Sequence, residues 1–95
     1  MASKMVIKFK YLTNRMLEEE LKQETEKWLK RIKAERKKIA LVDDDKENII
    51  NNIDSYISDS EHFLQKNDLI RAFEAVTYAW GILETIKNLG IIREG

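Results

Sequence analysis

Proline is absent from this chain of 95 residues, and glycine occurs only three times. Proline interrupts helices because it lacks a backbone donor and clashes with the preceding turn. A chain without proline that is rich in Lys, Glu, Leu and Ile is typical of a mostly helical protein. Its length suits one domain, since two domains would each be too small to bury a core. The sequence therefore predicts a single all-α domain over residues 1–95.

The first helix is expected over residues 13–39. Steps of three and four residues place its apolar side chains on one face, and the opposite face is almost entirely charged. This helix is longer than the two that follow, so one of its ends is expected to project. Its apolar face consists of Leu17, Leu21, Thr25, Trp28, Ile32 and Ile39.

Two shorter helices are expected over residues 45–66 and 68–89. Asn67 is suited to the left-handed position that ends a helix, and Asp68 is suited to cap the next one. A turn this short makes the two helices antiparallel. The sequence therefore predicts an up-down-up three-helix bundle, in which Gly90 ends the third helix.

The predicted core contains one apolar stripe from each of these two helices. A stripe of this kind, repeated at helical spacing, marks the buried face of an amphipathic helix. We expect the aromatic rings of Trp28, Phe63 and Phe73 to turn inward. The stripes are Ile49, Ile53, Tyr56, Ser60 and Phe63 in the second helix, and Phe73, Val76, Ala79, Trp80, Leu83 and Ile86 in the third.

Residues 1–12 show a different pattern. Met5, Ile7, Phe9 and Tyr11 alternate with other residues, which is the period of a strand. A lone strand has no partner in a helical monomer. We therefore expect a short N-terminal extended arm, with an early helical turn as the alternative.

Composition excludes several classes of protein. The chain has no cysteine, which rules out disulfides and thiolate metal sites. Its 17 basic and 17 acidic residues give no net charge, whereas proteins that bind nucleic acid usually carry an excess of basic residues. No apolar run is long enough to span a bilayer. We expect a cytoplasmic protein that does not associate with a membrane and binds no cofactor, and nucleic acid is an unlikely partner.

A basic patch lies in the second half of the first helix. Such a patch could contact phosphates or an acidic partner. The alternative is a solvated helix face whose cations complement the helix C-terminus. The patch consists of Lys27, Lys30, Arg31, Lys33, Arg36, Lys37 and Lys38.

Asp59 and His62 are the only candidates for a polar site. They lie three residues apart on the second helix, as two metal ligands or an acid–base pair could. A catalytic zinc needs a third protein ligand, and no motif supplies one. The pair is therefore better explained as a solvated surface pair.

The third helix has a second apolar face beside its core stripe. Ala75, Tyr78, Ile82 and Leu89 repeat at three- and four-residue steps, so the apolar arc is wider than a surface helix needs. The arc could pack against both other helices, or it could form a dimer or partner interface. Tyr78 lies farthest from the core stripe and best distinguishes these alternatives.

The last 40 residues contain the pattern Tyr56-x-x-Asp59-x-x-His62-Phe63, followed by the segments Arg71 to Ala75 and Tyr78 to Glu84. In these segments the chain resembles the archaeal family called domain of unknown function 357. The resemblance implies a three-helix domain from an archaeon with no established activity. The chain departs from the family pattern at three positions, with Asn67 in place of glycine, Trp80 in place of histidine and Glu84 in place of aspartate.

These observations together favour a non-enzymatic interaction module that self-associates or docks a protein partner through the second face of the third helix. Weak nucleic-acid binding through the basic patch and a metal or hydrolytic site at Asp59 and His62 are the alternatives. No phosphate-binding glycine loop or nucleophile motif occurs in the chain.

Overall fold

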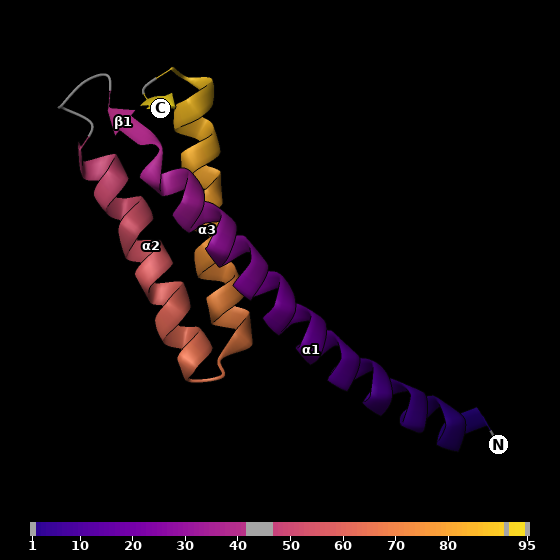
Figure 1. Cartoon of the computed structure of the whole chain (residues 1–95). Coiled ribbons are helices and arrows are strands. Elements are labelled where there is room, and N and C mark those ends of the chain that lie inside the picture. The colour runs from indigo at the N-terminus through magenta and orange to yellow at the C-terminus, as the bar shows by residue number, and fades with distance from the viewer. Residues whose placement is uncertain (1, 42–46, 91, 95) are drawn as a thin grey trace.

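The computed structural model of the chain describes residues 2–41, 47–90 and 92–94. Within these ranges the chain forms three helices that run up, down and up (Figure 1), which confirms the predicted all-α three-helix bundle. Two short strands close one end of it. The elements are α1 (Ala2–Lys37), β1 (Ile39–Leu41), α2 (Glu47–Gln65), α3 (Leu69–Asn88) and β2 (Ile92–Glu94).

The α2–α3 hairpin is built by the turn that the sequence predicts. Asn67 adopts a φ of 58°, in the left-handed region. Its N–H donates to the carbonyl of Leu64 at 3.0 Å, and the N–H of Asp68 donates to the carbonyl of Phe63 at 2.8 Å. These two bonds satisfy carbonyls that the helix end leaves free. The Asp68 carboxylate then caps α3 by accepting from the N–H of Arg71.

The core is aliphatic. Ile32, Ile53, Val76 and Leu83 are almost completely buried, one or two from each helix. The Ser60 hydroxyl, also buried, donates to a backbone carbonyl of α3, at Ala72, over 2.7 Å. This bond holds α2 and α3 close together.

The expectation that three aromatic rings turn inward is wrong. Trp28 and Phe63 are half-buried, and Phe73 is exposed. Alanines on the buried face of α3 draw the helices close, so aliphatic side chains fill the centre and rings lie at its edges. Leu17 of the predicted stripe is also exposed, whereas Leu29 is buried.

The strands β1 and β2 form an antiparallel ribbon that the sequence did not predict. Ile39 pairs with Glu94, and Leu41 pairs with Ile92. Ile92 is buried and packs on the core, so the ribbon covers one end of the bundle. The sequence also predicts a capping box of Asp44 with Glu47 and a contact of Ile91 with Ile86, but Asp44 and Ile91 lie outside the described residues.

The predicted N-terminal extended arm over residues 1–12 is corrected by the structure, because residues 2–12 continue α1. No glycine or proline separates them from the docked part of the helix, and extending an existing helix costs little. The hairpin turn lies beside Leu17 and Leu21, so α1 projects beyond it (Figure 1). We call residues 2–16 the projecting segment.

The projection makes the molecule elongated. Its principal extents are 64, 25 and 18 Å, and its radius of gyration is 17.5 Å. A compact domain of this length would have a radius of gyration of about 12 Å. The projecting segment therefore lies largely beyond the bundle that the other residues build.

Candidate interaction surface

An apolar groove runs along α3 on the side that faces away from α1. It has a volume of about 510 Å³. Tyr78 and Leu89 are 59% and 68% exposed, whereas Ile82 is half-buried in the groove. We call it the α3 groove; its lining includes Ile49 of α2 together with Tyr78, Gly81, Ile82, Thr85 and Leu89 of α3.

The predicted second apolar face of α3 is thus present in part. Tyr78, Ile82 and Leu89 line the groove, but Ala75 is buried and is not available to a partner. Ala75 is small, so it lies where α3 closely approaches the rest of the bundle. The expected interface therefore loses Ala75.

The groove is held in place by contacts between α2 and α3. The Tyr78 ring lies against the Tyr56 ring of α2, with ring centres 5.6 Å apart and planes tilted by 36°. This contact fixes one end of the groove while leaving most of Tyr78 in solvent. At Gly81 an added Cβ atom would meet no other atom within 4 Å. The groove is therefore open at its middle.

Acidic side chains surround the groove. Glu74 and Glu84 lie on α3 within one turn of groove residues, and Asp59 lies one turn from Tyr56. All three are exposed, and none forms an ion pair with the side chains that the structure describes. The cation on this part of α3, Lys87, instead pairs with Glu35 of α1 at 3.1 Å. The surroundings of the groove are consequently negative.

Two cations of the predicted basic patch hold α1 on the hairpin. Arg36 forms two hydrogen bonds, of 2.7 and 3.1 Å, with the carboxylate of Asp54 on α2. Lys33 pairs with Glu61 of α2 at 2.9 Å. These cations are neutralised by their own fold, which reduces what the patch could offer to a phosphate backbone.

The other five cations of the patch differ in how they are paired. Lys27 pairs with Glu24 within α1, and Lys38, which follows the end of α1, pairs with Glu35. The Arg31 guanidinium lies 4.9 Å from the centre of the Trp28 ring. Lys30 and Lys37 are exposed and form no ion pair within the described parts of the chain. Only part of the patch is therefore paired within its own fold.

Asp59 and His62 both lie exposed on α2. The His62 ring contacts the neighbouring Phe63 ring, with centres 5.8 Å apart. Among the residues that the structure describes, no group of three or more His, Cys, Asp or Glu side chains could hold a metal ion. Both side chains are therefore open to solvent.

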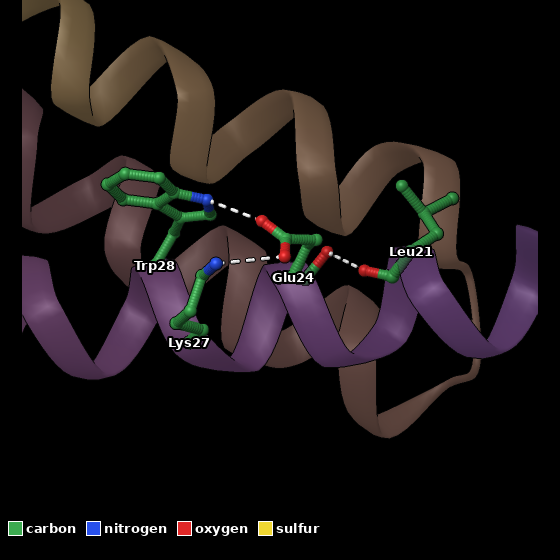
Figure 2. Close-up of polar contacts among 5 residues, drawn as sticks. Leu21, Glu24, Lys27 and Trp28 are labelled. Carbon is green, nitrogen blue, oxygen red and sulfur yellow. Dashed lines mark hydrogen bonds and ion pairs between the residues drawn. The ribbon is translucent and has the colours of Figure 1, made fainter.

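A polar cluster on α1 was missed by sequence reasoning. Figure 2 shows Glu24 accepting hydrogen bonds from Lys27 and from the Trp28 indole, each at 2.9 Å. The bond from Lys27, followed by that from Trp28, holds the pKa of the Glu24 carboxyl below its usual range. The only signal in the sequence was the spacing of three and four residues between these side chains.

The Trp28 ring links this cluster to α3. The Trp80 indole donates to the Trp28 backbone carbonyl at 3.1 Å, and the two rings meet edge to face with centres 5.6 Å apart. Trp80 occupies the position at which the family that this chain resembles commonly has histidine. In this chain the position joins two helices, and both indole N–H groups have partners, as buried edges of tryptophan require.

The chain is similar to known proteins over most of its length. A family model described as "Protein of unknown function (DUF357)" matches residues 14–92. A crystal structure of a protein from Archaeoglobus fulgidus, assigned to the same family model, is 48% identical with a TM-score of 0.76. That match covers 83% of this chain and 99% of the other. A comparison with curated proteins gives no match.

Within the described ranges, no helix has both the length and the apolar character that crossing a membrane would require.

Proposed function

This chain belongs to the DUF357 family of proteins of unknown function, and on that premise we propose that it is a non-enzymatic protein-interaction module whose contact surface is the α3 groove. The observation that carries the proposal is the exposure of Tyr78 and Leu89 beside an open apolar groove. Apolar side chains gathered in this way mark sites where proteins meet. A partner that presents an apolar helix fits a groove that runs along a helix.

The competing functions receive less support from the same surface. Nucleic-acid binding would need cations that are free to displace counterions, and four of the seven cations in the basic patch already form ion pairs. A hydrolytic or metal site would need more groups around Asp59 and His62 than that part of α2 provides. Of these surfaces, the α3 groove best supports a function, namely binding to another protein.

The proposal is tested with Tyr78→Glu and Ile82→Glu. Each substitution places a carboxylate in the groove, where a docking apolar surface would have to desolvate it. Asn51→Glu is the matched control, because Asn51 is exposed on α2, about 160° around the helix from Ile49, and gains the same charge. The three variants and the unmodified chain are immobilised and offered both purified chain and native extract, and retained proteins are identified by mass spectrometry.

We expect at least one protein, foreign or another copy of the chain, to be retained by the unmodified chain and by Asn51→Glu but lost from both groove variants. Circular dichroism checks that all four proteins stay helical. Retention of the same proteins by all four would show that the groove is not the contact surface, and the proposed function would then be wrong.

A further inference from the structure

We propose that the α3 groove of one copy receives the projecting segment of a second copy of this chain. This inference rests on the proposed function, since it names the partner of the same groove. Four features support it: the apolar row on the projecting segment, the direction of the segment, its charge and its length.

The projecting segment carries an apolar row. Met5, Phe9, Leu12 and Met16 follow one another at steps of four, three and four residues, which places these positions along one side of a helix. Residue 9 and the buried Thr25 are 16 residues apart, so at 3.6 residues per turn they differ by about 160° around the helix. The row therefore falls on the side of α1 opposite the one that docks on the hairpin.

The segment cannot reach the groove of its own chain. It continues α1 without a break and leads away from the α2–α3 hairpin (Figure 1). The α3 groove, in turn, lies on the side of α3 away from α1. The positions of the apolar row and the α3 groove thus lie on different sides of one molecule, and a second copy is what can bring them together.

Charge favours this pairing. The projecting segment contains four basic residues and no acidic one, a net charge of +4. The hairpin, residues 47–90, contains seven acidic and three basic residues, a net charge of −4. Pairing two projecting segments with each other would bring eight positive charges together. Docking a segment between Glu74, Glu84 and Asp59 instead places cations beside carboxylates that form no ion pair with the side chains described in the structure.

The lengths agree as well. The 15 residues of the projecting segment span about 22 Å of helix, and the groove from Thr77 to Leu89 spans about 18 Å. A helix laid along the groove would cover Tyr78 and Leu89. The open space at Gly81 would let its backbone approach closely.

Disulfide trapping tests the pairing, because the chain has no cysteine of its own. Phe9→Cys puts a thiol in the apolar row, and Thr85→Cys puts one in the groove without filling the space at Gly81. Asn14→Cys is the control, since it adds the same thiol to another side of the projecting segment. We expect oxidation of a mixture of Phe9→Cys and Thr85→Cys to give a crosslinked pair in about tenfold higher yield than a mixture of Asn14→Cys and Thr85→Cys.

Other outcomes would overturn the inference. Crosslinking of Phe9→Cys with itself would show that projecting segments pair with each other, and crosslinking of Thr85→Cys with itself would show that grooves pair. Equal yields from both mixtures would mean random collisions. Loss of binding to anionic lipid vesicles in Phe9→Glu, in a chain that stays monomeric, would assign the segment to a membrane surface instead.

The result can be separated from that of the proposed function. If the pure chain is monomeric by sedimentation at high concentration and no crosslink forms, while Tyr78→Glu still loses a foreign protein, this inference fails and the proposed function stands. If no protein depends on the groove but Phe9→Cys crosslinks to itself, both are wrong.

Discussion

At the scale of single residues, Gly81 is the position where helix stability and the proposed docking favour different residues. Helix stability favours a residue with a Cβ atom, and close docking favours glycine. It lies in the middle of α3, where glycine costs conformational entropy. An added Cβ would meet nothing within 4 Å, so packing inside the chain does not require glycine. The residue makes sense if something else approaches α3 closely at this point.

Gly81→Ala should therefore stabilise the chain while impairing docking. We expect the free energy of unfolding to rise by about 0.5–1 kcal/mol, because alanine restricts the unfolded chain and suits the helix. Urea denaturation measures this. A loss of stability would mean that α3 is not a regular helix at this residue.

Glu24 provides a prediction about pH. Its pKa is lowered in the folded chain by the bonds from Lys27 and Trp28. A group with a lowered folded pKa contributes stability above its unfolded pKa, and this contribution is lost as the pH falls through the folded pKa. We therefore expect the stability advantage of the unmodified chain over Glu24→Gln to shrink between about pH 7 and about pH 3. Urea denaturation of both proteins at each pH would show a constant difference if the carboxylate makes no contribution.

At the scale of elements, the turn between α2 and α3 depends on the left-handed conformation of Asn67. A side chain with a Cβ atom disfavours this conformation, asparagine less than most. We expect Asn67→Ala to lower the free energy of unfolding by about 1 kcal/mol and Asn67→Gly to leave it unchanged or raise it. Thermal denaturation of both variants would contradict this account if alanine were tolerated as well as glycine.

The elements also show what sequence reasoning can reach. The hairpin was predictable because Asn67 and Asp68 are local signals, decided by residues next to them. The ribbon was not, because strands of three residues have no period of their own and Ile39 pairs with a residue 55 positions away. The first 12 residues were misjudged because an alternation of Met5, Ile7, Phe9 and Tyr11 is compatible with a strand, while the continuity of α1 decided their conformation.

The candidate surface was predictable to a similar extent. Tyr78, Ile82 and Leu89 were identified from helical spacing, which places residues on a face of α3. Spacing does not say how close the neighbouring helix comes, so it did not show that Ala75 is buried. The ion pairs that neutralise Arg36 and Lys33 likewise depend on how the helices pack.

At the scale of the whole molecule, stability comes from a small core where three helices and the ribbon meet. Leu83 is completely buried there, whereas Leu89 lies on the same helix and is 68% exposed. We expect Leu83→Ala to lower the free energy of unfolding by about 2–5 kcal/mol and Leu89→Ala by less than about 0.5 kcal/mol. Urea denaturation that gave equal losses would mean that the bundle does not pack around Leu83.

The ribbon has a consequence for how the molecule presents its two chain ends. Because β2 is paired with β1, the C-terminal residues are held at the end of the bundle opposite the start of α1 (Figure 1). Dyes attached near the two termini would sit toward opposite extremes of the 64 Å axis. The two ends of the chain thus point away from each other. A cargo fused to one end would be separated from a cargo fused to the other by most of the length of the molecule.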